Sequence, residues 1–433
     1  MPRTFKGTVT SLPPDKSISH RSALIAAISE GTTEIENYSG GLDNQTTLGA
    51  LQQLGVAVHQ EISGDQLSNP RRKVRITGGG LRKLASPAEP LQCGNSGSTM
   101  RMLSGILAAQ PFTSTLIGDD SLMQRPMKRI VEPLSEMGAS FTLSETGTAP
   151  VVIHGTTSLK PISLRMTVPS AQVKSAVIFA GFHAEGITEI IEPVSTRNHT
   201  ELMLGLKSSR TSDGATLIRV YGGRTLHAKV FHIPADPSAA CFLVALGVLG
   251  TGNELLLKDV CLNPTRISYL SVLQDAGASI TFENERILGG ESIGDVIVKS
   301  SPIKPLRISG DTVAALIDEL PMLAVLSAMA TNAFELRGAA ELRAKESDRI
   351  AALVVNLQAM GFRCDEFPDG FSVAGRANTS PAHVSVRTFH DHRIAMSFFI
   401  ASRFTDAAVS LDDADCAAVS FPNFFDLIQS LEV

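Results

Sequence analysis

The chain alternates long apolar stretches with short strand-like runs, and this pattern recurs six times. Each recurring segment opens with polar, cation-bearing residues, continues as an apolar run of helical length, and ends in a turn followed by a short β-branched or apolar run. The segments span residues 20–38, 101–119, 174–192, 239–260, 319–336 and 393–411. Their openings lie roughly 65 to 80 residues apart, which favours one recurring supersecondary unit.

Turn residues mark where the apolar stretches end. Three segments place glycine where a helix end favours a residue that tolerates positive φ, and three use other residues: Gly31, Gly186 and Gly250, then Pro111, Asn332 and Asp406. Four further stretches predict the end of an amphipathic helix, a glycine cap and the start of a strand: LQQLGVAV at 51–58, LSEMGASF at 134–141, LQDAGASI at 273–280 and LQAMGFRC at 357–364. The predicted unit is therefore helix, strand, helix and strand, with a further strand.

Units of this kind cannot bury their apolar faces alone, so six copies should pack as two groups of three. We expect an α/β fold of two similar lobes joined by a hinge. The predicted lobes are 17–235, and 1–16 together with 236–433, with crossings near 13–16 and 234–237. The leading strand at 5–12 has no preceding helix and is predicted to complete the last unit in the other lobe.

Composition narrows the class of protein. The 433 residues are 43% hydrophobic and 19% charged, which is typical of a soluble globular chain, and the absence of Trp argues against aromatic platforms for nucleic acid. A net charge of −5 gives no global attraction to nucleic acid or anionic membrane. The five scattered Cys predict neither a disulfide framework nor a zinc site. Without a signal-like start or a membrane-length apolar run, we expect a cytoplasmic location.

Lys and Arg nevertheless recur at the predicted helix openings. The amino-terminal end of a helix carries partial positive charge, so a cation there is unfavourable unless an anion lies nearby. The cations concerned are Lys16, Arg21, Arg101, Arg125, Lys128, Arg129, Lys174 and Arg393. The pattern predicts a small ligand that bears several negative charges.

Each of these motifs has a structural alternative when it is taken alone. Ser17 or Ser19 can be a helix N-cap, and CGNSGS at 93–98 can be an ordinary Gly-Asn turn. The charged residues of 345–349 can form a solvated helix face, and His392 can be a hydrogen-bonded core histidine. Their joint occurrence at equivalent places in the repeats favours a functional site.

Asp318 and Glu319 open an apolar helix, where a carboxylate can serve as a cap or as a general base. Capping explains one of the two. A carboxylate that faces Arg and Lys would have a lowered pKa, which keeps it ionised and able to accept a hydroxyl proton.

Nine stretches carry a resemblance to a known family. They are DKSISHR at 15–21, CGNSGSTMR at 93–101, GDDSLMQRPMKRIVEPLSEMGA at 118–139, SAQVKSA at 170–176, TRNHTE at 196–201, DELP at 318–321, ELRAKESDRI at 341–350, DHRIAM at 391–396 and SFPNF at 420–424. With these stretches in family order, the chain resembles the 5-enolpyruvylshikimate-3-phosphate synthase family. The resemblance implies two lobes of three βαβαββ units each, in an inside-out barrel-like arrangement that closes on the substrates.

The resemblance also implies the site residues and the reaction. Contacts to shikimate 3-phosphate are expected from Lys16, Ser17, Arg21, Ser170, Gln172, Thr196, Arg197, Asp318 and Lys345. Contacts to phosphoenolpyruvate, or to the herbicide glyphosate, are expected from Lys16, Asn95, Gly97, Arg125, Gln172, Glu346, Arg349 and Arg393, with Arg101 supporting the glycine loop. The family transfers the enolpyruvyl group between these two substrates without a metal or cofactor. We expect a monomer with no nucleic-acid or membrane partner.

This chemistry suits the residue types. Addition of an alcohol to phosphoenolpyruvate needs proton delivery to the methylene, removal of the hydroxyl proton, and a clamp for carboxylate and phosphate. Arg and Lys supply the clamp. Asp318 is the expected base, and Lys345 or Glu346 is the expected donor to the methylene and its later acceptor.

Some positions depart from the family pattern. Pro14 replaces a usual Gly, Ser98 a usual Thr, and Val419 stands where some members have a Lys beside the phosphoenolpyruvate site. Gly97 leaves room beside the ligand, which implies sensitivity to glyphosate. Two rival functions remain. The first is that of the related transferase that acts on UDP-N-acetylglucosamine, which usually has a loop cysteine as its acid; Cys93 of this chain flanks the glycine loop and does not match that cysteine. The second is an inactive binding protein on the same fold.

Overall fold

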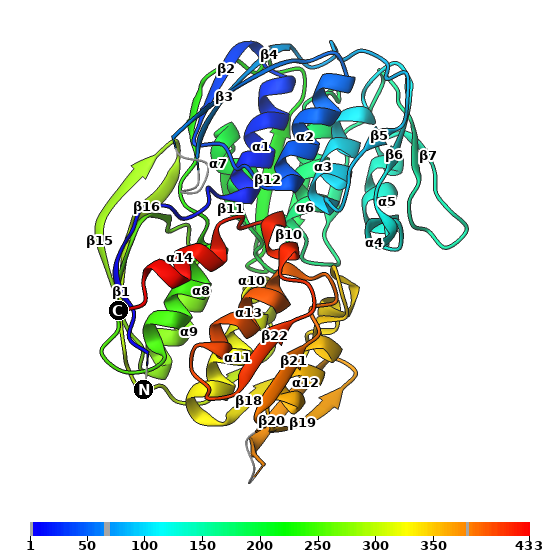
Figure 1. Ribbon diagram of the computed structural model, residues 1–433. Coiled ribbons are helices and arrows are strands. Elements are labelled where there is room, and N and C mark those ends of the chain that lie inside the picture. Colours follow the sequence, from blue (N-terminus) through cyan, green and yellow to red (C-terminus); the bar gives the residue numbers. More distant parts are fainter. Residues whose placement is uncertain (1–2, 65–69, 378–380) are drawn as a thin grey trace.

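The computed structural model describes residues 3–64, 70–377 and 381–433. Buried hydrophobic side chains form two clusters. The first, here the N-terminal core, runs from Ile18 to Ile233 and includes Cys261. The second, here the C-terminal core, runs from Ala235 to Leu431 and also includes Phe5, Val9 and Leu12. Figure 1 shows the helices of the two cores in the upper and lower parts of the molecule.

Three four-stranded sheets surround the N-terminal core. In order across each sheet they are β13 (Val230–His232), β2 (Glu30–Glu36), β4 (Arg71–Gly79), β3 (Ala57–Ser63); β5 (Leu91–Gln92), β6 (Thr113–Ile117), β8 (Val151–His154), β7 (Ser140–Thr142); and β9 (Ser163–Arg165), β10 (Ile187–Glu192), β12 (Thr216–Tyr221), β11 (Ser208–Arg210). The first two strands of each sheet are parallel and the other pairings are antiparallel. One strand-pairing scheme thus recurs three times.

The C-terminal core has two sheets of the same scheme and one smaller sheet. They are β1 (Lys6–Val9), β14 (Glu254–Cys261), β16 (Glu291–Lys299), β15 (Ser279–Leu288); β17 (Leu306–Ile308), β18 (Ala333–Leu336), β20 (Gly370–Arg376), β19 (Phe362–Phe367); and the parallel pair β21 (His383–Val386), β22 (Ala408–Leu411). The sheets are thus βαβ-type repeats in a mixed α/β fold, as the sequence pattern predicts.

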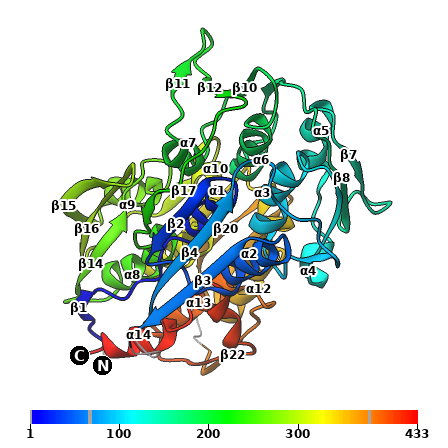
Figure 2. The same cartoon turned by 90° about the horizontal axis from the view of Figure 1, so that it is seen from above.

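Six helices lie inside the cores and correspond to the six predicted apolar stretches. They are α1 (Lys16–Ala27), α3 (Gly97–Leu107), α6 (Ala171–Gly181), α8 (Pro237–Val248), α11 (Leu320–Thr331) and α13 (His392–Ser402). Almost every residue of these helices is buried, because neighbouring helices and the sheets cover them on all sides. Viewed from above, β2 and β4 lie over α1 (Figure 2).

Other helices flank these six. They are α2 (Leu42–Gln53), α4 (Asp120–Met123), α5 (Lys128–Glu136), α7 (His199–Leu204), α9 (Ser268–Ala276), α10 (Thr312–Leu316), α12 (Arg349–Ala359) and α14 (Phe424–Ser430), with 3-10 turns η2 (Ala340–Ala344) and η3 (Asp415–Val419). The four predicted helix–glycine–strand stretches are confirmed at α2–β3, α5–β7, α9–β15 and α12–β19.

The prediction for the leading strand is wrong. Strand β1 pairs in parallel with β14, in register Lys6 to Glu254, and so completes the fourth segment rather than the last one. The side chain of Asn253 accepts a hydrogen bond from the Phe5 backbone N–H at 2.8 Å, and Phe5 itself is fully buried. These two contacts fix the strand at the edge of β14, a partner that local periodicity could not identify.

Candidate active site

The predicted site residues come from distant segments and meet where the two cores face each other. Ion pairs that join the cores here include Arg197 with Asp318, Arg125 Nη1 with Glu346 Oε1 at 3.8 Å, and Arg129 Nη1 with Glu341 Oε1 at 2.9 Å. All the predicted site residues are buried or half-buried. The cations are therefore gathered between the cores and are not spread over the outer surface.

Asp318 lies among arginines just before α11. One carboxylate oxygen bonds Arg197, and the other lies 3.7 Å from Arg393 Nη2 and 3.9 Å from Arg349 Nη1. Arg393 Nη1 also donates to the Asp318 backbone carbonyl at 2.6 Å. Burial alone would raise the pKa of Asp318, but the positive charges of Arg393 and Arg197, with those of Lys345 and Arg349, hold it well below its usual range. Asp318 is thus an ionised carboxylate that can accept a proton.

A second ionised carboxylate, Glu346, lies beside the start of α12. Arg349 Nη2 donates to Glu346 Oε2 at 2.6 Å, while Arg349 Nε donates to Asp391 Oδ2 at 2.8 Å. Burial opposes ionisation of Glu346, yet the charges of Arg349 and Arg125 dominate and hold its pKa well below the usual value. Arg349 is therefore fixed by Asp391, and Glu346 is held without its proton.

Lys345 carries a charge of the opposite sign beside this pair. Its Nζ lies 3.6 Å from Glu341 Oε1, and burial lowers its pKa although Asp318 and Glu341 act in the other direction. A lysine with a lowered pKa gives up its proton more readily than an ordinary one. Sequence analysis missed Glu341, a carboxylate four residues before Lys345 at the start of the 3-10 turn Ala340–Ala344.

The opening of α1 supplies further predicted residues. Lys16 Nζ forms an ion pair with Asp43, a partner that the sequence analysis missed. Arg197 Nη1 donates to Ser17 Oγ at 3.3 Å. Arg21 is nearly fully buried and donates to the Ser17 carbonyl at 3.1 Å and to hydroxyls on α6 and α7. Contacts within the protein therefore orient all three predicted residues of this helix.

The glycine loop before α3 brings Asn95, Gly97 and Arg125 together. Arg125 Nη2 donates to Asn95 Oδ1 at 2.7 Å. A Cβ atom on Gly97 would lie 2.9 Å from Arg101 Nη1, which would have to shift, and 3.5 Å from Arg125 Nη1, an ordinary contact. The absence of a side chain at Gly97 thus keeps space beside the cations.

Arg101 supports the glycine loop through Gln172. Its Nη1 donates to Gln172 Oε1 at 2.8 Å, and Gln172 Nε2 donates to Ser98 Oγ at 3.0 Å. Burial, aided by the neighbouring arginines 125 and 129, lowers the pKa of Arg101 to about 9. The predicted residue Gln172 is thereby joined to the glycine loop.

The prediction that Lys174 faces an anionic ligand is wrong. Its ammonium is fully buried and pairs with Glu192 at 2.9 Å and Glu201 at 2.8 Å, so its charge is already neutralised. Glu192 also accepts a hydrogen bond from the Thr196 backbone N–H at 3.0 Å. Lys174 therefore stabilises the loop that carries Thr196 through their shared partner Glu192. Residue type and position alone could not distinguish this structural role from ligand binding.

Ser170 and Thr196 make their hydrogen bonds to residues outside the predicted set. Ser170 Oγ caps α6 by accepting from the Val173 N–H at 3.4 Å, and the Thr196 hydroxyl bonds to Glu192. His392, left open by the sequence, is a buried residue whose Nε2 has no partner within the described residues. Burial and the Arg393 charge lower its pKa to about 4, so the ring is neutral near pH 7.

The site has the chemistry of an anion-binding centre with its own acid and base. The positive charges that act on the two ionised carboxylates come from Lys16, Arg125, Arg197, Lys345, Arg349 and Arg393. In residues 3–64, 70–377 and 381–433, no group of three or more His, Cys, Asp or Glu is placed to hold a metal ion. No helix within those ranges has the length and apolar character needed to cross a membrane. The fold and the site together define an α/β enzyme for small, multiply anionic substrates.

Comparison with known proteins gives the family. Residues 1–428 match the family of EPSP synthase (3-phosphoshikimate 1-carboxyvinyltransferase), and the chain belongs to this family, as its motifs predict. The chain is 58% identical over 433 residues to the 3-phosphoshikimate 1-carboxyvinyltransferase of Pelodictyon phaeoclathratiforme, with 100% of both chains covered. It is also 58% identical to that of Chlorobaculum tepidum over 430 residues, covering 99% of each.

Solved structures of related proteins show the same fold. An EPSP synthase from Acinetobacter baumannii, 40% identical, superposes with a TM-score of 0.83 and covers 100% of this chain and 97% of its own. The enolpyruvyl transferase NikO from Streptomyces tendae shares the fold at 16% identity and a TM-score of 0.71, covering 99% of this chain and 96% of its own. The fold therefore extends over relatives with little sequence in common.

Proposed function

We propose that this chain transfers the enolpyruvyl group of phosphoenolpyruvate to the 5-hydroxyl of shikimate 3-phosphate and releases phosphate, a step in the shikimate pathway of aromatic amino-acid synthesis. One observation carries the proposal: Asp318 is held ionised among Arg197, Arg349 and Arg393, which come from both cores. A base inside a cluster of cations suits an alcohol that must lose a proton beside two phosphorylated acids.

Shikimate 3-phosphate binds mainly at the openings of α1 and α6. The hydroxyls of Ser17, Ser170 and Thr196 and the amide of Gln172 provide hydrogen bonds, while the guanidinium and ammonium groups of Lys16, Arg21 and Arg197 hold the phosphate and carboxylate. Asp318 and Lys345 reach the ring from the C-terminal core. The ion pair between Arg197 and Asp318 opens in part to admit the substrate hydroxyl.

Phosphoenolpyruvate binds between the glycine loop and the openings of α12 and α13. Asn95, Gly97, Arg125 and Gln172 approach it from the N-terminal core, and Arg349 and Arg393 from the C-terminal core, with Lys16 between the two substrates. Glu346 lies 3.8 Å from Arg125 and 2.6 Å from Arg349, so it orients both guanidinium groups. Glyphosate, which carries phosphonate and carboxylate groups, competes for this clamp in the space beside Gly97.

The reaction has two stages. Asp318 takes the proton of the 5-hydroxyl as its oxygen forms a bond to C2 of phosphoenolpyruvate, and the Lys345 ammonium donates a proton to C3. The neutral Lys345 amine then removes a proton from the new methyl group as the C2–O bond to phosphate breaks, and the proton held by Asp318 passes to the departing phosphate. Lys345 rather than Glu346 is assigned as the donor, because Glu346 is kept ionised by Arg349 and Arg125 and has no proton to give.

The finer architecture follows from the same proposal. Residues 17–235 form one lobe and residues 1–16 with 236–433 the other, each with three βαβαββ units in an inside-out barrel-like arrangement. The two hydrophobic cores support this division, and the crossings near 13–16 and 234–237 act as the hinge. The lobes close on the substrates, and the enzyme acts as a cytoplasmic monomer without metal or cofactor.

A phosphate-release assay tests the function. Phosphoenolpyruvate is supplied with shikimate 3-phosphate or with UDP-N-acetylglucosamine, and release with the first acceptor alone is expected. Release only with the UDP-sugar would assign the related transferase activity instead. No phosphate release with either acceptor would favour a binding protein on the same fold.

A further inference from the structure

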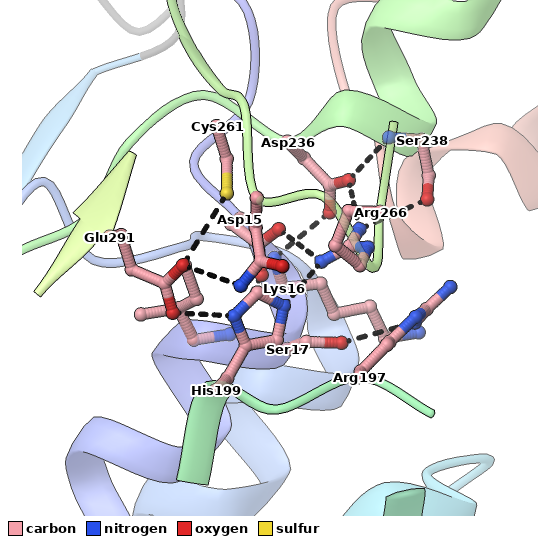
Figure 3. Close-up of polar contacts among 12 residues, drawn as sticks. Asp15, Lys16, Ser17, Arg197, His199, Asp236, Ser238, Cys261, Arg266 and Glu291 are labelled. Carbon is pink, nitrogen blue, oxygen red and sulfur yellow. Dashed lines mark hydrogen bonds and ion pairs between the residues drawn. The ribbon is translucent and has the colours of Figure 1, made fainter. Parts of the chain in front are cut away.

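A buried network of charged side chains lies where the two interlobe crossings meet, next to the site but outside the predicted set. Its centre is Arg266, in the loop before α9, which is 2% exposed. Figure 3 shows its guanidinium between Asp15, Asp236, Ser238 and His199. Each of these partners is itself buried, with Asp15 and His199 fully inaccessible. Burial of so many polar groups is costly unless they are paired, and within the described residues both Nη atoms of Arg266 are paired while its Nε is not.

The two chain crossings are held directly against each other. The Asp15 N–H donates to the Pro234 carbonyl at 2.7 Å, and the Asp236 N–H donates to the Pro13 carbonyl at 2.9 Å. The crossings thus form a short antiparallel bridge between Pro14 and Ala235. Any motion of one lobe against the other must pass through this bridge.

Each crossing ends in an aspartate that caps a core helix. Asp15 Oδ1 accepts from the Ile18 N–H at 2.7 Å and caps α1, and Asp236 Oδ1 accepts from the Ser238 N–H at 2.8 Å and caps α8. Arg266 joins the two caps: its Nη1 donates to Asp15 Oδ2 at 2.6 Å and its Nη2 to Asp236 Oδ1 at 3.0 Å. One planar guanidinium therefore fixes the amino-terminal ends of two helices from different cores.

The network reaches one side of the site through Lys16. Asp236 Oδ2 accepts from the Lys16 backbone N–H at 3.0 Å, so the carboxylate held by Arg266 also holds the first residue of α1. Ser17 follows immediately and bonds Arg197 at 3.3 Å. The position of the α1 opening thus depends on the Arg266 guanidinium through two carboxylates, Asp236 at the Lys16 N–H and the cap Asp15 at the Ile18 N–H.

The network reaches the opposite side of the site through Ser238. Arg266 Nη2 donates to Ser238 Oγ at 3.1 Å, and the Ser238 hydroxyl donates to Glu319 Oε1. Glu319 follows Asp318 directly and precedes α11. Arg266 is therefore linked to the assigned base as well as to Lys16, while it touches neither proposed substrate.

His199 and Glu291 complete the shell around Arg266. Arg266 Nη1 lies 3.0 Å from His199 Nε2, which must accept, so His199 Nδ1–H donates to Glu291 Oε1 at 2.6 Å. Asn263 Nδ2 also donates to Glu291 at 2.8 Å. These contacts orient the plane of the Arg266 guanidinium. Its orientation is therefore set by His199 and Glu291 in addition to the two aspartates.

We propose that Arg266 is a positioning residue for the reaction, which fixes the openings of α1 and α11 relative to each other through Asp15, Asp236 and Ser238. The inference rests on the proposed function. The proposed contacts to shikimate 3-phosphate lie mostly in the N-terminal core, whereas those to phosphoenolpyruvate are divided between the cores. Loss of Arg266 therefore spares binding of shikimate 3-phosphate alone and impairs turnover and use of phosphoenolpyruvate.

A charge-neutral double variant separates positioning from simple stabilisation. Arg266→Met alone leaves buried carboxylates without their counter-charge and is expected to destabilise the fold. Arg266→Met with Asp15→Asn removes one charge of each sign, and the Asn side-chain oxygen can still accept from the Ile18 N–H. Asp236 keeps its two backbone donors at residues 16 and 238. Arg266→Lys keeps the charge but cannot bridge both aspartates with a planar fork.

The measurements are thermal unfolding, calorimetric binding of shikimate 3-phosphate alone, and kcat and KM for phosphoenolpyruvate by phosphate release. The double variant and Arg266→Lys should unfold near the wild-type temperature and bind shikimate 3-phosphate within about threefold, yet lose at least about tenfold in kcat/KM for phosphoenolpyruvate, as expected for sub-ångström misplacement. Arg219→Met, which breaks an exposed ion pair with Glu189, serves as the control with kcat near wild type.

Two outcomes would overturn the proposal. If kcat/KM returns to the wild-type value together with stability in the double variant, Arg266 only neutralises buried charge. Full activity of Arg266→Lys would equally show that the bidentate bridge is dispensable. A wild-type chain that releases no phosphate with shikimate 3-phosphate removes the proposed function itself, and the positioning role with it, so the two failures are distinguishable.

Discussion

Arg197 and Asp318 form an ion pair across the two cores, with one carboxylate oxygen of Asp318 bonded to the Arg197 guanidinium. Arg197 follows β10 in the N-terminal core and also donates to Ser17 Oγ at 3.3 Å, while Asp318 precedes α11 in the C-terminal core. The pair therefore joins the proposed binding surface for shikimate 3-phosphate to the assigned base. The two halves of the site are assembled by the same contact that orients the base.

Replacement of Asp318 by Ala should reduce kcat by at least about a hundredfold, because no other group at this point accepts the hydroxyl proton. Calorimetry should find binding of shikimate 3-phosphate largely retained, since most of its proposed contacts lie in the N-terminal core. Asp213→Ala, which breaks an exposed ion pair with Arg165, is the matched control. Unchanged turnover in Asp318→Ala would remove this residue from the mechanism.

The pH dependence of kcat should report Lys345. Burial lowers the pKa of Lys345 below its ordinary value, and the donor must be protonated, so kcat should fall as the pH rises through this lowered pKa. The pKa of Asp318 is held well below its usual range, and Asp318 acts in its ionised form. Its titration should therefore cause no fall in kcat on the acid side of neutral pH. Lys345→Met should lose turnover, whereas Glu346→Gln should retain a basic limb. A basic limb that vanishes only in the Glu346 variant would reverse the assignment.

Arg125→Ala should mainly raise the KM for phosphoenolpyruvate, by about ten- to a hundredfold for the loss of a charge-assisted bidentate contact. Binding of shikimate 3-phosphate alone should be unaffected, because Arg125 bonds the glycine loop through Asn95 and lies 3.8 Å from Glu346 on the other core. Lys128→Ala provides a control at an exposed cation of the same segment. An effect confined to shikimate 3-phosphate contradicts the clamp.

Gly97→Ala should weaken inhibition by glyphosate and raise the KM for phosphoenolpyruvate. The added methyl carbon would lie 2.9 Å from Arg101 Nη1, too close without a shift of that guanidinium, and 3.5 Å from Arg125 Nη1. Inhibition curves at fixed shikimate 3-phosphate measure both effects. Wild-type turnover that persists at saturating glyphosate would refute the predicted sensitivity.

Lys174→Met should destabilise the fold by about 3–5 kcal/mol, because it leaves Glu192 and Glu201 buried without a counter-charge. Denaturant unfolding gives the free energy, and Lys299→Met, which breaks an exposed pair with Glu254, should change it by less than about 1 kcal/mol. A stability equal to wild type in Lys174→Met would mean that the two glutamates take up protons at little cost.

The sequence by itself determined the repeated unit, the helices and most of the candidate site. Apolar stretches long enough for a buried helix predicted α1, α3, α6, α8, α11 and α13, because helix formation and burial are both encoded locally. The excess of cations at their openings predicted an anionic ligand, since such placement opposes the helix dipole. Asp318 and Arg393 were singled out from residue type and position, whereas the role of Lys345 came from the resemblance to the family.

Only the tertiary structure decided which strand completes which sheet and which cation is free to bind. Strand β1 joins β14 because Asn253 and a buried pocket for Phe5 lie there, contacts between residues far apart in the chain. Lys174 and Arg101 look alike at helix openings, yet the first is neutralised by two buried glutamates and the second supports Gln172. The central position of Arg266 was likewise invisible in the sequence. Charge is a property of one residue, but its pairing depends on neighbours that the folded chain brings from elsewhere.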